Sequence, residues 1–514
     1  MDKNFYITTP IYYPSAKPHM GHAYSSIIAD FFARFKQMDG YKVNFLTGTD
    51  EHGLKIQRAA EKRGLNTLKF CDEISETFRD LSKILNLTNT DFIRTTEERH
   101  KKSVQNLWKE LEKNDDIYLS KYSGWYSVSD EAFYAEDEIE ELEGKKIAIA
   151  SKSPVEWMDE ESYFFRLSRW EKPLLDYYRD NPDFISPESK KNEVISFVKS
   201  GLKDLSVSRK SFSWGIPVPN NKEHVIYVWL DALTNYISAL NYPNTNSDLF
   251  KKFWPANIHL IGKDILRFHA IYWPAFLLAA KLPLPKKIYG HGWILSGDEK
   301  MSKSKGNILD PIEIINQYGL DPLRYYLIKE VSFGNDGNIS QSRLEDCINS
   351  DLANNFGNLC QRVTAFTIKN CEGNIPDNIE FNDEDLVILD KFKNNLDIIR
   401  EKIDDLDLNF YIDFIVKILF ETNKYFNDQE PWKKKDNNIR RMNTIVYTTL
   451  EIVRKISFLL YPIIPQSSLN ALKIFSIKQN EIDYSTIDNN TYLKNGSKIN
   501  KIDILFKKIE KNND

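Results

Sequence analysis

Short apolar runs alternate with stretches of helical periodicity over the first 115 residues. Residues 5–9 (Phe-Tyr-Ile-Thr-Thr) and 43–47 (Val-Asn-Phe-Leu-Thr) predict strands, and the pattern over 23–31 predicts a helix between them. Strands separated by helices favour a parallel sheet, whose ligands bind at the carboxyl ends of the strands. The fold class expected is therefore α/β.

The strand–helix alternation stops between residues 116 and 222, where aromatic residues and an acidic run (136–143) replace it. This mixture predicts a domain inserted into the sheet. The acidic run is expected to be a solvated face that repels phosphates. The alternation returns at 225–229, 258–262 and 288–290, so the inserted domain is expected to split the sheet into two halves.

From about residue 348 the pattern is helical and glycine becomes scarce. This change predicts an α-helical bundle as the last domain. The expected helices are 352–368, 386–403, 410–426 and 438–460, and residues 493–514 are expected to form a last helix with a frayed tail.

Composition narrows the function classes. A chain of 514 residues is too long for one core and implies about three units. Its net charge of −5 means that any contact with nucleic acid would be local. The N-terminus has no secretory or transit pattern, and the longest apolar stretch, 270–280, is too short for a membrane span. A cytoplasmic protein without membrane contact is expected.

Two loops carry candidate chemistry. His19-Met20-Gly21-His22 lies before the first predicted helix, where backbone amides and two imidazoles can donate to phosphate oxygens. Gly21 would let a nucleotide approach the backbone closely. Lys300-Met301-Ser302-Lys303-Ser304 places two ammonium groups on a loop suited to holding pyrophosphate. Alone, the first loop is more typical of capping or core histidines, and the second of a solvated surface.

Together, the loops resemble the HIGH and KMSKS signatures of class I aminoacyl-tRNA synthetases, which have a Rossmann-type sheet. Several blocks resemble the methionyl-tRNA synthetase family in particular, from the N-terminus to about residue 435. These blocks are 7–13, 45–53, 201–209, 227–233, 261–264 and 268–275. The resemblance implies that ATP activates L-methionine as methionyl-adenylate with release of pyrophosphate. Methionine then passes to the 3′ end of initiator and elongator tRNA(Met), and AMP is released.

The resemblance also implies a methionine pocket. Asp50 would supply the anion for the α-ammonium, and an apolar, polarizable lining would surround the thioether. His269 could add a hydrogen bond near the sulfur. The residues expected to line the pocket are Ile11, Tyr13, Trp229, Ala232, Leu233, Tyr236, Phe268 and His269. Rejection of other amino acids would rest mainly on shape.

For ATP, the resemblance implies that His19 and His22 lie at the phosphates, with Gly21 beside them. Lys300 and Lys303 would take the β- and γ-phosphates. Gly262 and Asp264 are expected to hold the ribose, and Gly292, Trp293 and Ile294 the adenine. Mg²⁺ would accompany ATP, bound mainly by phosphate and water.

The segment 423–432 resembles the anticodon-reading segment of the family. Trp432 would stack on a base and Asn423 would hydrogen-bond a base edge. Asn355 and Arg362, on a facing helix, are weaker candidates. Lysines 433–435 would contact phosphates and make binding salt-dependent.

Two departures from the family pattern matter. Relatives often carry zinc-binding cysteine pairs in the inserted domain, whereas residues 126–130 contain no cysteine, and none of Cys71, Cys347, Cys360 and Cys371 forms a C-x-x-C pair. Bound zinc is therefore not expected. The sequence also lacks an appended tRNA-binding barrel, so a monomer is expected.

The resemblance gives each predicted segment a role. The expected limits are 1–115 and 223–295 for the two halves of the Rossmann catalytic domain, 116–222 for the inserted connective-peptide domain, 296–347 for the KMSKS loop and stem-contact region, and 348–514 for the anticodon-binding domain. Two alternatives stay open. A synthetase for leucine, isoleucine or valine would need a larger editing insertion, and an inactive RNA-binding paralogue would not need both intact loops.

Overall fold

The structure, a computed structural model, describes residues 3–14, 17–127, 132–134, 136–142, 144–149, 151–296, 299–300 and 310–510. The chain forms two compact units, each assembled from separate segments. One contains residues 4–18 and 43–291, and the other contains residues 1–3, 19–42 and 292–514. We call them the sheet unit and the helical unit.

The sheet unit is built on six strands in the order β3-β2-β1-β14-β15-β9. The pairs β2–β3, β1–β14, β14–β15 and β15–β9 are parallel. The strands are β1 (Asn4–Tyr12), β2 (Lys42–Thr49), β3 (Asp91–Arg94), β9 (Ile185–Ser186), β14 (Ile258–Gly262) and β15 (Ile288–His291). The strands predicted at 5–9, 43–47, 258–262 and 288–290 are thereby confirmed, and their parallel pairing agrees with the expected fold class.

Helices complete the sheet unit. They are α2 (Leu54–Lys62), α3 (Thr67–Ile84), α4 (Glu98–Lys113), α5 (Glu171–Asp180), α6 (Glu188–Lys199), α7 (Trp229–Leu233), α8 (Asn235–Ser238), α9 (Asp248–Phe253) and α10 (Trp273–Ala279), with a π-helical turn at Phe268–Tyr272. One large apolar core joins strand residues such as Tyr6 and Ile261 to helix residues such as Trp108 and Trp273. This core fixes the strand ends from which the site residues project.

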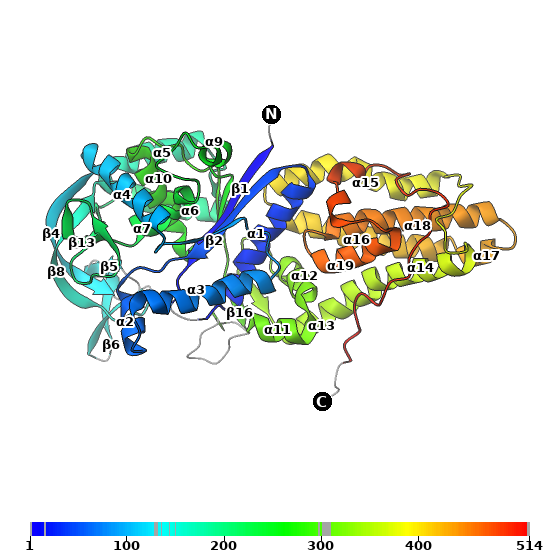
Figure 1. Cartoon of the computed structure of the whole chain (residues 1–514), viewed down its shortest axis with the longest axis horizontal. Helices are drawn as coiled ribbons and strands as arrows, with labels where there is room; N and C mark the ends of the chain where they lie inside the picture. Colours follow the sequence, from blue (N-terminus) through cyan, green and yellow to red (C-terminus); the bar gives the residue numbers. More distant parts are fainter. Residues whose placement is uncertain are drawn as a thin grey trace. The chain divides into compact units, whose positions relative to one another are not determined.

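In sequence, a group of antiparallel strands stands between the two parts of the parallel sheet, and it is seen at the left of Figure 1. The longest pair is β4 (Ile117–Ser127) with β8 (Glu156–Phe165), flanked by β5 (Ala132–Tyr134) and β10 (Leu205–Ser206). A separate hairpin joins β6 (Ile139–Leu142) to β7 (Lys145–Ala148). The interrupted strand–helix alternation therefore corresponds to a change from parallel to antiparallel pairing. Although β9 lies between β8 and β10 in sequence, it pairs with the parallel sheet.

The run at 225–229 was expected to continue the parallel sheet, and this expectation is wrong. Residues 221–226 form β13 (Asn221–Ile226), which pairs antiparallel with β12 (Ile216–Val218) and β11 (Ser208–Arg209). Val218 lies opposite Asn221, so two residues join the strands, and Asn220 has φ +66°. A two-residue connection produces an antiparallel hairpin, because a parallel pair needs a long crossover.

The helical unit begins with α1 (Met20–Met38) and continues after residue 291. A small sheet comes first, formed by β16 (Ile294–Ser296), β17 (Glu299–Lys300) and β18 (Gly337–Ile339). The helices are α11 (Pro311–Tyr318), α12 (Leu320–Glu330), α13 (Gln341–Cys347), α14 (Asn358–Asn370), α15 (Asp383–Asp404), α16 (Leu408–Asp428), α17 (Pro431–Lys434), α18 (Ile439–Leu460) and α19 (Pro465–Leu472). The helices α14, α15, α16 and α18 pack together as a bundle (Figure 1), so the four predicted helices are confirmed. A π-helical stretch, Ile348–Gly357, runs into α14.

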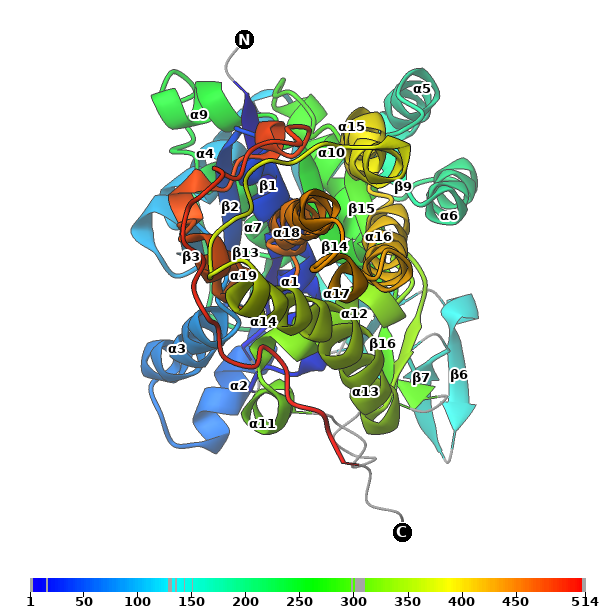
Figure 2. The same cartoon turned by 90° about the vertical axis from the view of Figure 1, so that its right-hand side faces the viewer.

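The predicted last helix is wrong for the described residues 493–510, which form no helix (the red segment in Figure 2). Their backbone pairs mainly with neighbouring parts of the chain. Gln361 donates to the carbonyls of Ile502 and Asp503, and the Ile499 amide donates to the Gly373 carbonyl. Asparagine and glycine are poor helix formers, so these external partners outweigh the helical alternative.

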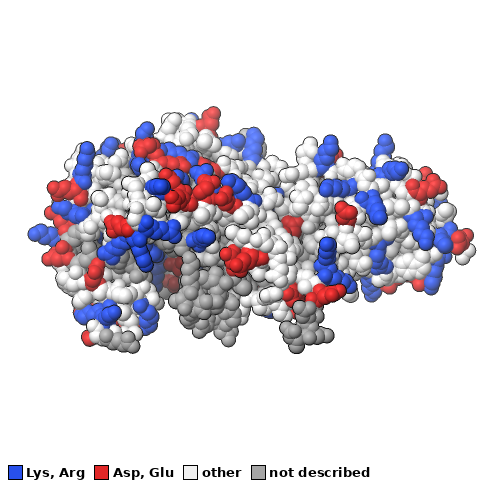
Figure 3. All heavy atoms as spheres, turned by 60° about the horizontal axis from the view of Figure 1, so that its bottom comes forward, with Lys and Arg blue, Asp and Glu red and all other residues white. Residues whose placement is uncertain are grey.

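Acidic and basic side chains are interspersed on the face shown in Figure 3. This mixture agrees with the small net charge and leaves that face without one dominant basic surface. Within the described part of the chain, no helix is long and apolar enough to cross a membrane.

Candidate functional site

The first signature loop caps helix α1 with its own side chains. His19 is the N-cap: its Nδ1 accepts from the Gly21 amide at 3.1 Å, while His22 Nδ1 accepts from the His19 amide at 3.0 Å. The two rings lie 3.8 Å apart. Burial and the nearby His19 imidazole hold the pKa of His22 well below its usual value. Each Nδ1 is an acceptor, so in the neutral imidazole the proton is on Nε2. In this cap both histidines therefore carry their proton on Nε2, from which each can donate a hydrogen bond.

Gly21 is required by this cap. A Cβ at residue 21 would lie 2.9 Å from Cε1 of His19, which folds over it. The expected reason for the glycine was close approach of a nucleotide. The structure adds an internal reason, since the histidine side chain already occupies that space.

The second signature loop lies mostly outside the described residues. Lys300 ends β17, and residues 301–309, including Lys303, are not described. The preceding segment is anchored tightly. The Trp293 amide donates to the Asp336 carboxylate at 2.8 Å, and a Cβ at Gly292 would lie 2.1 Å from the Asn335 carbonyl oxygen. Ile294 is buried at the start of β16.

In the sheet unit, the structure brings the predicted pocket residues together. Trp229 begins α7, and its ring stacks on Phe268 with centroids 3.7 Å apart and planes 15° apart. His269 meets the same indole edge-on at 6.5 Å. Ala232 and Leu233 are both buried, Leu233 within the large core of the sheet unit, and Ile11 packs against that core. These side chains form an aromatic and aliphatic cluster of the kind a thioether requires.

One polar contact lies within this cluster. The Tyr236 hydroxyl lies 2.7 Å from Nε2 of His269, and Nδ1 of His269 lies 3.0 Å from the Ile265 carbonyl oxygen. Both side chains are almost completely buried. Burial lowers the pKa of His269 to about 4, so the ring is neutral at physiological pH. Both ring nitrogens of His269 are thus bonded within the protein.

Asp50 follows β2 and is only partly buried. Its amide donates to the Tyr12 carbonyl at 2.9 Å, which ties the end of β2 to the end of β1. Tyr13 is held over the same segment, since its hydroxyl donates to the His52 carbonyl at 3.3 Å. The predicted ammonium-binding carboxylate therefore stands at the carboxyl end of a parallel strand, where sheet ligands bind.

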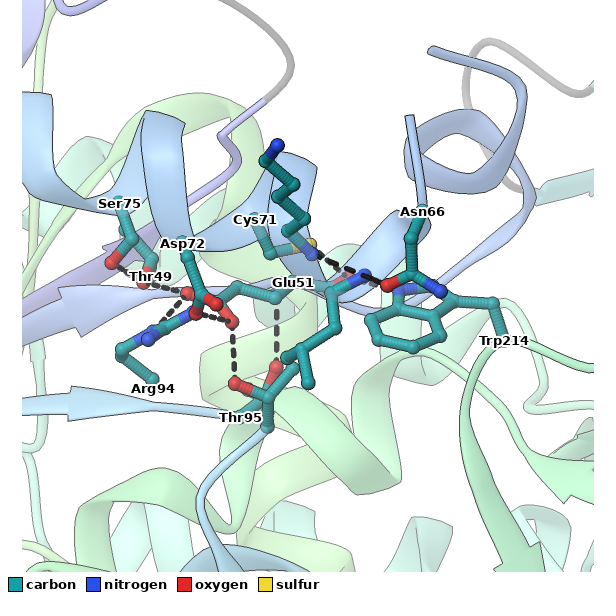
Figure 4. Close-up of polar contacts among 12 residues, drawn as sticks. Thr49, Glu51, Asn66, Cys71, Asp72, Ser75, Arg94, Thr95 and Trp214 are labelled. Atoms are coloured by element: carbon teal, nitrogen blue, oxygen red, sulfur yellow. Dashed lines mark hydrogen bonds and ion pairs between the residues drawn. The ribbon is translucent and has the colours of Figure 1, made fainter. Parts of the chain in front are cut away.

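The next residue, Glu51, is completely buried and was missed as a functional residue (Figure 4). Arg94 donates from Nε and Nη2 to its two carboxylate oxygens at 2.7 and 3.0 Å. The hydroxyls of Thr49 and Thr96 donate to the same group at 2.7 and 2.5 Å. Four donors therefore satisfy one buried charge.

The backbone of Glu51 is held as firmly as its side chain. The Glu51 amide donates to the Thr95 hydroxyl at 2.9 Å, and the Trp214 indole donates to the Glu51 carbonyl at 2.6 Å (Figure 4). The peptide groups before and after Glu51 are thus each held by a side chain. We infer that this lock orients the Asp50 carboxylate.

A second buried charge lies in α7. Asp231 accepts from His52 Nδ1 at 2.6 Å and from His100 Nε2 at 2.8 Å. Burial by itself would raise the pKa of Asp231. The His52 charge and the hydrogen bonds from both histidines outweigh it and lower the pKa from 3.8 to about 2. A sequence signal for this group exists, because an aspartate inside the apolar run 228–233 needs a buried partner.

Gly262 and Asp264 lie at the carboxyl end of β14. Asp264 is exposed within a short 3₁₀ turn, Lys263–Ile265. A Cβ at Gly262 would lie 2.6 Å from Asp264 Oδ1, so the glycine lets this carboxylate fold back over the strand end. An exposed carboxylate here can accept from hydroxyl groups of a sugar.

In the helical unit, the four predicted RNA-reading residues make two sets of contacts. Asn423 donates to the Asn355 side chain at 2.6 Å. Arg362 lies 5.4 Å from the ring of Phe426, and Trp432 meets the same ring edge-on at 6.2 Å. Trp432 is 38% exposed, which leaves part of the indole open to a base. The four residues combine an exposed aromatic ring with amide and guanidinium donors.

Two family models match the chain. Residues 5–364 match class I tRNA synthetases (M), and residues 375–514 match the anticodon binding domain of methionyl tRNA ligase. The chain belongs to the methionyl-tRNA synthetase family. The predicted enzyme class, an ATP-dependent class I aminoacyl-tRNA synthetase, is confirmed.

Curated relatives match this chain in sequence over nearly its whole length. The methionine–tRNA ligase of Brucella suis biovar 1 is 48% identical over 486 residues, which are 94% of each chain. That of Rickettsia felis is 48% identical over 516 residues, which are 99% of each chain. The structure of Mycobacterium tuberculosis methionyl-tRNA synthetase in complex with methionyl-adenylate superposes with a TM-score of 0.95 at 43% identity, over 98% of this chain and 99% of that one. The predicted fold class, a parallel central sheet followed by a helical anticodon-binding domain, is confirmed.

Proposed function

We propose that the chain activates L-methionine with ATP and transfers it to tRNA(Met), both initiator and elongator. The observation that carries this proposal is the match of both family models, which together span residues 5–364 and 375–514. In the first step the methionine carboxylate attacks the α-phosphate, which forms methionyl-adenylate and releases pyrophosphate. In the second step the terminal tRNA hydroxyl attacks the activated carbonyl and AMP leaves.

The geometry of the sheet unit supports the methionine roles. Asp50 would pair with the α-ammonium, while Trp229 and Phe268 would enclose the thioether. Ile11, Tyr13, Ala232, Leu233, Tyr236 and His269 would complete the lining. The neutral state of His269 suits this substrate, because a cation beside the uncharged side chain would be left without a partner.

The ATP roles rest on the signature loops. Neutral His19 and His22 would donate from Nε2 to phosphate oxygens, and charge that develops there in the transition state would strengthen these bonds. Lys300 and Lys303 would hold the leaving pyrophosphate. Asp264, beside Gly262, would accept from the ribose, while Gly292, Trp293 and Ile294 would face the adenine.

Mg²⁺ would arrive with ATP. Among the described residues no group of three or more His, Cys, Asp or Glu side chains could hold a metal ion. Phosphate oxygens and water would supply most of its ligands, because Mg²⁺ dehydrates reluctantly. Bound this way, the ion would neutralise phosphate charge. We also propose that the protein acts as a cytoplasmic monomer.

Amino-acid-dependent exchange of pyrophosphate into ATP tests the proposal across the twenty amino acids. We expect exchange with methionine and with no other amino acid at comparable rate. Exchange with leucine, isoleucine or valine instead would overturn the substrate assignment. An absence of exchange with every amino acid would favour the inactive RNA-binding alternative.

A further inference from the structure

A buried hydrogen bond joins the two elements that carry the proposed methionine-binding residues. His52 follows Asp50 closely in the segment after β2, and its Nδ1 lies 2.6 Å from Asp231 Oδ2. Asp231 belongs to α7, the helix that begins with Trp229. His52 is 7% exposed and Asp231 is 1% exposed. The bond connects residues 179 positions apart and ties the Asp50 segment directly to the helix that carries the stacked indole.

The carboxylate fixes the direction of this bond. Against the effect of its burial, the two histidines lower the pKa of Asp231 to about 2, so the group is ionised at neutral pH and can only accept. His52 Nδ1 therefore donates to one carboxylate oxygen, and His100 Nε2 donates to the other at 2.8 Å. Hydrogen bonds with an ionised acceptor are roughly twice as strong as neutral ones. The contact between His52 and Asp231 is thus a strong joint between two separate elements.

His100, on α4, anchors Asp231 from its other side. His100 is completely buried, and its Nδ1 lies 3.1 Å from the Ser238 hydroxyl oxygen on α8. The Ser238 hydroxyl also lies 2.9 Å from the Thr234 carbonyl oxygen, between α7 and α8. One side chain of α4 therefore contacts both short helices. Asp231 is held in place on the core side, and His52 is tied to it.

The rest of His52 contacts groups next to the proposed ammonium partner. Its carbonyl accepts from the Tyr13 hydroxyl at 3.3 Å. Its ring meets the Trp214 ring edge-on at 5.8 Å, and the Trp214 indole donates to the Glu51 carbonyl (Figure 4). A shift of His52 would therefore move Tyr13 and the segment that carries Asp50 together.

We propose that His52 and Asp231 are positioning residues, which set the separation between the ammonium-binding and thioether-binding ends of the methionine pocket. The inference rests on the proposed methionine activation. A fixed number of bonds separates the α-ammonium from the thioether, so a pocket held at one separation selects one chain length. Groups that are already in place when the substrate arrives also avoid an entropic cost of binding.

The substitution His52→Leu tests this proposal. Leucine is apolar and removes the donor to Asp231, which keeps its bond from His100. In pyrophosphate exchange, we expect KM for methionine to rise about tenfold, the factor that one hydrogen bond can supply, while KM for ATP stays within about twofold. The ratio of kcat/KM for ethionine to that for methionine should rise about fivefold, because ethionine is one methylene longer and a rigid pocket rejects such a group about tenfold or more.

His52→Asn is the matched control. The amide nitrogen of asparagine can take the place of Nδ1 and donate to Asp231, so both quantities should return close to those of the unmodified protein. Equal effects of Leu and Asn would show that ring packing matters and the hydrogen bond does not, which would overturn the proposal. An unchanged KM for methionine in His52→Leu, or an equal rise in KM for ATP, would overturn it as well. If the unmodified protein shows no exchange with methionine, the proposed function itself fails, which is a different result.

A second measurement uses the unmodified protein and does not depend on the folding of His52→Leu. If the bond between His52 and Asp231 favours methionine binding, methionine must favour that bond by the same factor, because coupling is reciprocal. In ¹⁵N-histidine-labelled protein, the His52 Nδ1 proton should exchange with solvent about tenfold more slowly in saturating L-methionine and within about twofold of its original rate in ATP alone. The signal is identified by its absence in His52→Asn. An unchanged exchange rate with methionine would overturn the proposal.

Discussion

The buried carboxylate of Glu51 offers a sharp test of how the loop after β2 is held. In Glu51→Gln the side chain keeps its shape, but one carboxylate oxygen becomes an NH₂ group. Each oxygen accepts from one Arg94 N–H and one threonine hydroxyl. Whichever way the amide turns, its NH₂ faces an arginine N–H. The hydroxyl can rotate to accept, whereas the guanidinium can only donate.

The size of the expected loss of stability follows from these contacts. One charge-assisted hydrogen bond is lost and the other loses its ionised acceptor, and hydrogen bonds to charged groups are worth about 1.5–3 kcal/mol each. Arg94 remains paired with Asp72 at 2.6 Å, and its side chain is 18% exposed, so the loss should lie near the lower end of the range for broken buried pairs. We expect the free energy of unfolding to fall by about 3 kcal/mol. For a large domain this lowers Tm by about 6 °C or more.

Asp72→Asn is the matched control, because it removes the other partner of the same arginine at a position that is 54% exposed. A pair of this kind is worth about 0–1 kcal/mol. Calorimetric Tm values measure both effects, and pyrophosphate exchange measures the consequence for Asp50. KM for methionine should rise more in Glu51→Gln than KM for ATP. The reasoning is refuted if Asp72→Asn lowers Tm as much, or if Glu51→Gln leaves Tm unchanged.

Three further predictions concern the carboxylates of Asp50 and Asp231 and the exposed ring of Trp432. Asp50→Asn should lower kcat/KM for methionine in pyrophosphate exchange by about 10²-fold or more, since the ammonium would lose its charged partner; an equal effect on KM for ATP would contradict this. Asp231→Asn should lower the free energy of unfolding by about 2 kcal/mol at neutral pH, because folding lowers the pKa of Asp231 from 3.8 to about 2. That stability is present above pH 3.8 and disappears as the pH falls toward 2, so the Tm difference from the unmodified protein should shrink over that interval; a constant difference would refute it. Trp432→Ala should lower kcat/KM for tRNA about 10–100-fold through lost stacking and spare pyrophosphate exchange, whereas loss of both activities would indicate a structural role.

Much of the fold could be predicted because its signals are local. Apolar runs of strand length located β1, β2, β14 and β15, and 3.6-residue periodicity located α15, α16 and α18. Both patterns need only neighbouring residues, since burial of one face sets the period. The predictions for 225–229 and 493–510 were wrong because the conformation of these segments depends on which other segments they pair with. A two-residue turn decided the pairing of β13, and contacts with Gln361 and Gly373 kept the last segment from forming a helix.

The sequence by itself determined the signature loops, the family and most of the residues expected at the site, because these are properties of residue type and spacing. Only the tertiary structure showed how buried polar groups are satisfied. Thr8 and His259 are 251 positions apart, and His100 and Asp231 are 131 apart. A buried polar group must find a partner, but local sequence does not say which one. The partner is decided when the strands and helices close on one another, and that choice sets the direction of each hydrogen bond in the site.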